Sequence, residues 1–293
     1  RGGGLLIPKA FIQAWGQHAT WPDPRQVEQD LIISRALCDL FSAPGLKGKI
    51  AFRGGTAINK LLFAKPMRYS EDIDLVQLES EPIKSTVDTM RHALDWLGKP
   101  SFAQGKHSMH LVYLFKPETD ENATLKLKVE MNTREHKSLN GIVLMPFTMD
   151  NPWHKADVQV ATYTPDELFS TKLRALLQRE KNRDLFDLHH GLEQLKLDPA
   201  HVVAGLEYYL AQQDLAISRA NAEERMLKKL TRSLIEDIHP LLPPGITFDE
   251  DLALRAFERV WRDLIARIKG EPWKSTEKAL EELRAAKYPS LLT

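Results

Sequence analysis

Two aspartates and two glycines of this 293-residue chain have the types and spacing for chemistry on phosphates. Asp72 and Asp74 lie in a stretch of alternating polar and apolar residues, which places both on one face of a predicted strand. Two carboxylates side by side on a rigid element can bind one hard cation such as Mg²⁺. Upstream, Gly54-Gly55-Thr56 precedes a helical pattern; such a turn brings backbone amides, and here the Thr56 hydroxyl, close to a phosphate. Together these residues predict metal-assisted phosphoryl or nucleotidyl transfer.

Three further side chains extend this group. Arg68 and Ser70 lie between the glycines and the aspartates, where Arg68 would neutralise charge on a triphosphate and Ser70 would face the metals. Glu130 projects from the polar face of a predicted strand over residues 124–131. A third carboxylate there would complete a two-metal site and could orient or deprotonate an attacking hydroxyl. Each feature alone is also typical of a turn or a solvated strand face, but their combination favours the functional interpretation.

A second group of charged residues follows Thr164. The run Thr164-Pro165-Asp166-Glu167 has the pattern of a capping box and predicts a helix from Pro165. Between residues 172 and 183, five basic residues stand against one acid, which predicts a basic patch for RNA. Lys172, at the margin of the apolar face, either extends to solvent or reaches a triphosphate. The other charged residues are Arg174, Arg179, Lys181, Arg183, Asp184 and Asp187, and the two aspartates could instead pair structurally with these bases.

The elements that must position these groups form a strand-rich part followed by a helical part. Strands are predicted at residues 49–52, from 70, and at 110–115, 124–131 and 157–163, with helices over 22–43, from Thr56, and over 84–97. Beyond residue 164 the pattern is helical and includes a broad apolar stripe from Leu252 to Ile268. The expected fold is an α+β domain over residues 1–163, followed by a helical domain over 164–293 that completes the active-site cleft.

Composition excludes several classes of protein. Hydrophobic residues make up 43% and charged residues 27%, which excludes disorder of the whole chain. Forty basic and forty acidic residues balance, so affinity for nucleic acid must come from local patches. A single cysteine, Cys38, fits a reducing cytosol, and no apolar run is long enough to cross a bilayer; we expect a soluble, cytoplasmic protein without a membrane partner. His189 and His190 are adjacent, so their side chains are expected to diverge, and no third metal ligand is evident.

Four separated motifs give the sequence a resemblance to a known family. They are Phe52-Arg53-Gly54-Gly55-Thr56-Ala57-Ile58-Asn59-Lys60, Arg68-Tyr69-Ser70-Glu71-Asp72-Ile73-Asp74-Leu75, Glu167-Leu168-Phe169-Ser170-Thr171-Lys172-Leu173-Arg174-Ala175-Leu176 and Arg183-Asp184-Leu185-Phe186-Asp187-Leu188. On these motifs, which span roughly residues 50–190 in the family's order, the chain resembles the AbiEii/AbiGii nucleotidyltransferase toxins.

The resemblance implies a minimal nucleotidyltransferase fold of the DNA polymerase β type, with a mixed sheet, in a chain that ends in helices. It also implies toxins of type IV toxin-antitoxin and abortive-infection systems, which act in phage defence. Characterised members use an NTP with Mg²⁺, or Mn²⁺ in its place, to add nucleotides to the 3′ end of tRNA and so block aminoacylation. The implied partners are therefore an NTP, tRNA or another RNA, and a cognate antitoxin, a winged-helix protein of the AbiEi kind.

Roles for individual residues follow from the same resemblance. By motif, Gly54, Gly55 and Thr56 would hold phosphates, Asp72 and Asp74 the metals, and Lys172 the triphosphate. Asp184 would be an essential active-site carboxylate. The remaining nucleotide-binding candidates are Arg68, Ser70, Arg179 and Asp187, and Glu130 as third metal-binding carboxylate follows from the fold's usual strand arrangement. The family's first motif often has Gly-Ser where this chain has Gly-Gly-Thr, so the hydroxyl lies one place later.

Two other functions compete with an RNA-modifying toxin. The first is nucleotidyl transfer to a small hydroxylated molecule such as an antibiotic. The second is a catalytically silent module that binds nucleotide and docks a partner. The acidic set argues against a silent module, because binding alone does not need paired carboxylates.

Overall fold

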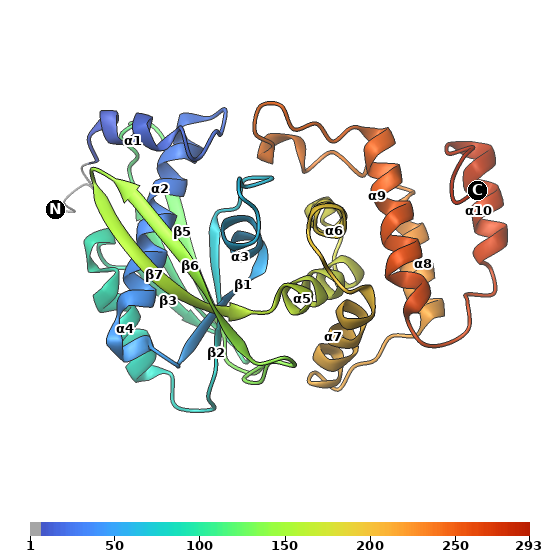
Figure 1. Cartoon of the computed structure of the whole chain (residues 1–293), viewed down its shortest axis with the longest axis horizontal. Helices are drawn as coiled ribbons and strands as arrows, with labels where there is room; N and C mark the ends of the chain where they lie inside the picture. Colours follow the sequence, from blue (N-terminus) through green and yellow to red (C-terminus); the bar gives the residue numbers. More distant parts are fainter. Residues whose placement is uncertain (1–6) are drawn as a thin grey trace. The chain divides into compact units, whose positions relative to one another are not determined.

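The structure, a computed structural model, describes residues 7–293. It divides into two compact units. The first unit extends to Thr164 and includes the short segment Leu242–Gly245, and the second comprises Pro165–Leu241 and Ile246–Thr293. The first unit holds the β-sheet and the second is helical (Figure 1).

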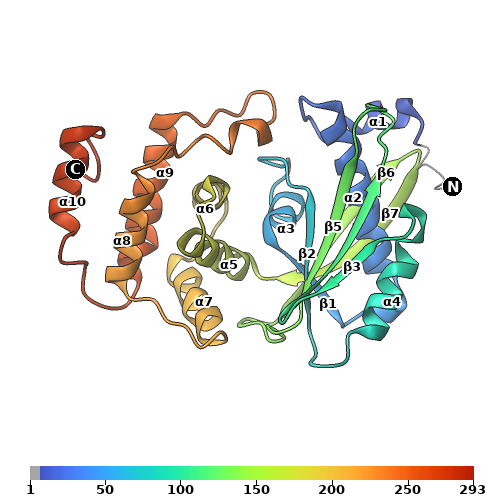
Figure 2. The same cartoon turned by 180° about the vertical axis from the view of Figure 1, so that it is seen from behind.

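The first unit is built on a mixed seven-stranded sheet among the described residues, with strand order β3-β4-β5-β2-β1-β7-β6. Two pairs within it are parallel, β2 with β5 and β1 with β7, and the other neighbours are antiparallel. Figure 2 shows the sheet from the other side. The strands are β1 (Ile50–Arg53), β2 (Asp72–Gln77), β3 (Ser101–Gln104), β4 (Ser108–Phe115), β5 (Leu125–Asn132), β6 (Ile142–Asn151) and β7 (His154–Tyr163).

Helix α2 (Pro24–Ser42) provides most of the helical cover of this sheet. Asp23 accepts a hydrogen bond from the Arg25 amide and Pro24 takes the first helical position, a favourable start for a helix. The helix packs against β2, β5, β6 and β7, and its apolar residues are buried there. The other helices of this unit are α1 (Lys9–Trp15), α3 (Gly54–Leu61) and α4 (Lys84–Ala93).

The second unit is formed by helices. Helix α5 packs against α6 and α7, α6 packs against α9, and α10 contacts α8. The apolar stripe predicted from Leu252 forms the buried face of α9, whose Phe257 and Val260 are fully buried. The helices are α5 (Pro165–Gln178), α6 (Asn182–Gln194), α7 (Pro199–Ala211), α8 (Arg219–Lys229), α9 (Glu250–Asp263) and α10 (Thr276–Ala286).

The predicted α+β class is confirmed, with some differences at the level of elements. Helix α1 and strands β3 and β6, the two edge strands of the sheet, were not predicted. Helix α3 begins at Gly54 and not at Thr56, because the two glycines form its first turn. None of the helices within residues 7–293 combines the length and the apolar character needed to cross a membrane.

Candidate active site

The carboxylates of Asp72, Asp74 and Glu130 lie on two neighbouring strands. In the parallel register of β2 with β5, Asp72 faces Lys128 and Asp74 faces Glu130. Asp72 and Asp74 are half-buried whereas Ile73 between them is fully buried, so the two aspartates share the face that is open to solvent. The pleat of β5 gives Lys128 and Glu130 the same orientation. The sheet therefore brings Glu130, which is far away in the sequence, next to the strand that carries Asp72 and Asp74.

A lysine ammonium group lies among these carboxylates. Lys128 Nζ is 3.0 Å from Glu130 Oε2 and 3.5 Å from Asp72 Oδ2. Burial acts to lower the pKa of Lys128, but the hydrogen bond to Glu130 and the charge of Asp72 outweigh it and raise the pKa. His110 Nδ1, on β4, lies 3.5 Å from Glu130 Oε2. This face of the sheet thus attracts positive charge.

The carboxyl group of Asp74 lies near other negative charges, and its pKa is raised. Burial raises its pKa, and the nearby charges of Asp72 and Glu130 raise it further, while Arg53 opposes them. A divalent cation would relieve this repulsion, and carboxylate oxygens are the ligands that Mg²⁺ and Mn²⁺ prefer. The donor chemistry of Asp72, Asp74 and Glu130 therefore fits such an ion. Within residues 7–293, however, their oxygens do not all lie within 4.8 Å of one another, and Lys128 occupies the space between two of them.

The glycine turn lies directly against the carboxylates. Gly54 has φ +82°, and a Cβ built on it would lie 2.3 Å from Asp74 Oδ2. A Cβ on Gly55 would lie 2.5 Å from a terminal nitrogen of Arg68. Gly54 therefore requires glycine for its backbone conformation and for space, whereas a side chain at position 55 would have to displace the Arg68 guanidinium. The start of α3, with its amides, follows at once.

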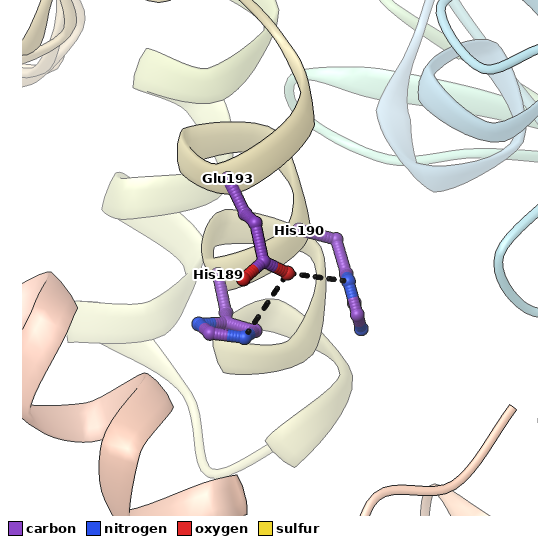
Figure 3. A group of neighbouring side chains, drawn as sticks. All are labelled: His189, His190 and Glu193. Atoms are coloured by element: carbon purple, nitrogen blue, oxygen red, sulfur yellow. Dashed lines mark ion pairs between the residues drawn. The ribbon is translucent and has the colours of Figure 1, made fainter.

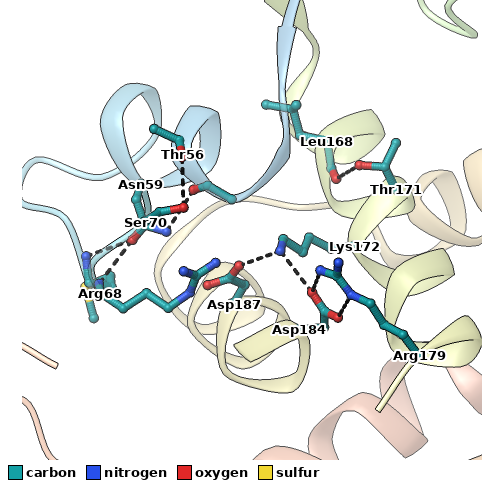
Figure 4. A network of polar contacts seen from close by, with 12 residues as sticks. Thr56, Asn59, Arg68, Ser70, Leu168, Thr171, Lys172, Arg179, Asp184 and Asp187 are labelled. Atoms are coloured by element: carbon teal, nitrogen blue, oxygen red, sulfur yellow. Dashed lines mark hydrogen bonds and ion pairs between the residues drawn. The ribbon is translucent and has the colours of Figure 1, made fainter. Parts of the chain in front are cut away.

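Side chains of α3 hold the segment between the glycines and β2 (Figure 4). Thr56 is buried; its Oγ1 donates to the Asp72 carbonyl at 2.5 Å and lies 2.8 Å from Ser70 Oγ. Asn59 Oδ1 accepts from the backbone amide of Arg68 at 3.2 Å, and its Nδ2 donates to the Gly55 carbonyl. The Arg68 side chain is only 2% exposed. The Thr56 hydroxyl thus has a structural use in this arrangement, and its predicted contact with phosphate stays a prediction.

In the second unit, the predicted charged residues form a buried network. Lys172, 5% exposed, lies 3.0 Å from Asp184 Oδ1 and 2.9 Å from Asp187 Oδ2. Arg179 binds Asp184 from another side, with Nε at 2.7 Å and Nη2 at 2.8 Å (Figure 4). Burial acts to raise the pKa of Asp184, but the charge of Lys172 and the hydrogen bonds from Arg179 prevail and hold it well below its usual value. Lys172 therefore has its charge compensated by two aspartates and does not extend to solvent.

Packing divides the basic residues of the run 172–183 into a buried set and a more exposed set. Arg174 is buried with Lys172, and its guanidinium lies 5.3 Å from the centre of the Tyr209 ring. Arg179 keeps 44% of its side chain exposed and Lys181 is exposed, whereas Arg183 is half-buried. The prediction of a basic surface patch across the whole run is therefore wrong, because the exposed basic side chains are confined to residues 179–183.

The adjacent histidines of α6 do have a third potential ligand nearby. His189, His190 and Glu193 each offer one ligand atom, and the three atoms lie within 4.8 Å of one another (Figure 3). The expectation that the two imidazoles diverge without a partner is wrong. The reason is helical spacing: Glu193 is four residues after His189 and three after His190, and so lies next to both.

Comparison with known proteins decides the family. A sequence model of the family described as nucleotidyl transferase AbiEii toxin, type IV TA system, matches residues 35–282. The chain belongs to this AbiEii family. It is therefore a nucleotidyltransferase of a toxin family, which implies an NTP substrate and an antitoxin partner. No curated protein matches the chain in sequence.

The solved structure of MenT4 agrees with the AbiEii assignment at the level of the fold. MenT4, a nucleotidyltransferase toxin from Mycobacterium tuberculosis H37Rv, is similar with a TM-score of 0.59 and 15% identity, over 98% of each chain. JHP933 from Helicobacter pylori matches with a TM-score of 0.48 and 16% identity, over 90% of this chain and 98% of that chain. The likeness to MenT4 confirms the nucleotidyltransferase fold.

Several residues around the AbiEii motifs were not singled out from the sequence. Lys128 looked like an ordinary solvated lysine of a strand, and its pairing became visible only through the register of β5 with β2. The position of His110 opposite Glu130 likewise depends on a strand register, that of β4 with β5. Asn59 lies four residues after Gly55, a helical spacing that is a weak local signal for its bond to the Gly55 carbonyl.

Proposed function

We propose that this chain transfers a nucleoside monophosphate from an NTP to a hydroxyl of an RNA, with the 3′ end of tRNA as the acceptor, and that the product tRNA cannot be aminoacylated. The observation that carries the proposal is the register of β2 with β5, which sets three carboxylates beside the Gly54-Gly55 turn. A phosphate-binding turn next to metal-binding oxygens is the requirement of this chemistry.

The site residues of the first unit have the following roles in this proposal. Asp72, Asp74 and Glu130 would hold Mg²⁺ or Mn²⁺, which when bound supplies charge neutralisation at the α-phosphate and the leaving group. The amides after Gly54 and Gly55 bind a phosphate at the start of α3. The Arg68 guanidinium, packed on Gly55, adds positive charge next to that phosphate.

The reaction is an in-line displacement at phosphorus. The acceptor hydroxyl oxygen forms a bond to the α-phosphorus, and the bond from that phosphorus to the oxygen bridging toward the β-phosphorus breaks. Pyrophosphate leaves with the electron pair of the broken bond, and the hydroxyl proton passes to a carboxylate oxygen, for which Glu130 is the candidate.

The roles of the second unit rest on the family resemblance. Lys172 is proposed to act on the triphosphate, and Asp184, with Asp187 and Arg179, to hold the lysine in place through the contacts described above. An RNA acceptor is favoured over a small hydroxylated compound because the family consists of toxins of type IV systems. The antitoxin partner and an origin in phage defence belong to the same proposal.

Label transfer tests the proposal. The purified protein is incubated with each α-labelled NTP, Mg²⁺ and either total RNA or a panel of hydroxylated antibiotics. We expect label in RNA of tRNA size, a loss of about 100-fold or more in Asp72→Asn, and no loss in Asp88→Asn, an exposed carboxylate on α4. Label on an antibiotic alone would contradict the RNA acceptor, and no transfer from any NTP to either class would contradict the function.

A further inference from the structure

Helix α6 presents three potential metal ligands within one turn. Glu193 Oε2 is 3.7 Å from His189 Nε2 and 3.8 Å from His190 Nδ1 (Figure 3). Adjacent helical positions point about 100° apart, so two neighbouring histidines seldom face one ligand. Here the glutamate, one turn further on, lies beside both columns of side chains and closes a three-membered set.

The two imidazoles lack the hydrogen bonds that buried polar groups usually have. His189 is 3% exposed and His190 6% exposed. Among residues 7–293, neither nitrogen of His189 has a hydrogen-bond partner, and His190 Nε2 has none either. His190 Nδ1 has only the Gln194 amide, at 3.4 Å. A buried donor or acceptor without a partner costs roughly 1–3 kcal/mol, so two such side chains in one place point to a missing ligand.

The types of side chain in the cluster suit a divalent metal ion, because two buried imidazoles lie beside one carboxylate. Glu193 supplies the negative charge, and its other oxygen lies 3.8 Å from Arg259 on α9. Neutral imidazole nitrogens with one carboxylate are a ligand set of zinc sites.

We propose that His189, His190 and Glu193 form a zinc-binding site on α6, distinct from the carboxylates of β2 and β5. Zinc takes two imidazole nitrogens and a carboxylate oxygen at about 2.0–2.2 Å, so the side chains must close in by small rotations about their χ angles. Glu193, with 46% of its side chain exposed, gives the ion access from solvent. Because α6 also carries Asp184 and Asp187, the ion would stabilise the helix that holds the Lys172 network.

Zinc binding to the full chain tests the site. The protein, freed of metals with a chelator, is titrated with Zn²⁺ against a fluorescent competitor, and Co²⁺ serves as a spectroscopic probe. We expect one saturable equivalent, and visible absorption from Co²⁺ with nitrogen ligands. Glu193→Gln and His190→Gln should each weaken zinc binding by about 10-fold or more, on the scale seen when the support of a metal ligand is lost. His92→Gln, an exposed histidine on α4, is the matched control and should bind as the wild type does.

Two variants separate this site from the proposed catalytic one. Asp72→Asn should leave the zinc affinity unchanged, and Glu193→Gln should weaken it by about 10-fold or more. The reverse result would assign the ion to β2 and β5 and overturn the proposal. It would also be overturned by the absence of a saturable equivalent, or by equal zinc affinity of Glu193→Gln and His92→Gln. Because Glu193 is half-exposed, its conservative change should leave the fold intact, and the unfolding transition of each variant verifies this.

Discussion

At the scale of single residues, the backbone of Gly54 and the side chain of Asp74 lie in direct contact. The carboxylate of Asp74 occupies the space that any side chain at position 54 would need. The glycine therefore does two things: it allows the positive φ of the turn and it lets the aspartate lie against the backbone. The glycine turn and the strand that carries the proposed metal ligands meet at this contact.

Gly54→Ala should therefore inactivate the protein. Its Cβ must displace Asp74, and a misplacement of about 1 Å in an active site can cost about 100-fold in rate. Gly48→Ala is the matched control: its φ of +73° imposes a similar backbone penalty, about 1–2 kcal/mol, but no described atom lies within 4 Å of the new Cβ. Label transfer and urea unfolding of both variants check this. Full activity in Gly54→Ala would show that the contact with Asp74 is unimportant.

Asp184 is the residue on which the Lys172 network depends most. Asp184→Asn leaves Lys172 and Arg179 without their shared carboxylate, and breaking a buried pair costs about 3–5 kcal/mol. Glu180→Gln breaks the exposed pair with Arg232 and should cost less than about 1 kcal/mol. Chemical denaturation of the two variants measures both values. Equal stability of the two variants would mean that the network contributes little to the fold.

The same aspartate predicts a dependence on pH. Its pKa is lowered in the folded state, so its contribution to stability is present above the unfolded value of about 3.9 and is lost as the pH falls below it. The difference in unfolding free energy between the wild type and Asp184→Asn should therefore shrink below about pH 4, by up to about 1.4 kcal/mol per pH unit. Denaturation at pH 7, 4 and 3 measures this difference, and a constant value would contradict the assigned shift.

At the scale of elements, the pairing of β2 with β5 creates the candidate site. Lys128 lies between two of its carboxylates and reduces their repulsion when no divalent ion is present. Lys128→Met should lower the melting temperature without divalent ions and increase the gain in melting temperature from Mg²⁺. Lys126→Met, exposed on the same strand, should change neither quantity. Thermal unfolding with and without Mg²⁺ makes the comparison. If Mg²⁺ raised the melting temperature equally in all three proteins, Lys128 would have no influence on metal binding.

Elements whose hydrophobic period was clear could be predicted from the sequence, and the edge strands could not. The alternation around Asp72 and around Glu130 gave β2 and β5, and the apolar period gave α2 and α9. Strand β3 is exposed at all four positions, so it has no alternation to detect. Strand β6 contains Pro146, a residue tolerated at a sheet edge, where one side of the strand forms no ladder. Contacts such as Lys128 with Asp72 need the register, which no local pattern contains.

At the scale of the whole molecule, zero net charge limits how RNA can be bound. Any electrostatic attraction must come from local basic surface such as residues 179–183, and about three phosphate contacts there predict a loss of roughly 20- to 40-fold in affinity between about 50 and 200 mM salt. The double variant Lys181→Gln, Arg183→Gln should bind less tightly and with a smaller salt slope. Lys84→Gln, Lys155→Gln, on exposed lysines of the first unit, should bind as the wild type does. Filter binding of tRNA checks this, and an affinity that does not change with salt would favour a small-molecule acceptor.

The most direct test of the central claim is stoichiometric. Intact RNA masses and released pyrophosphate are measured together for the wild type and for Asp74→Asn, with the unfolding transition of each protein recorded. We predict one pyrophosphate for every nucleoside monophosphate added to RNA by the wild type, and a loss of about 100-fold or more in a variant that remains folded. A folded Asp74→Asn protein that extends RNA at the wild-type rate would show that the carboxylates of β2 and β5 do not carry the reaction.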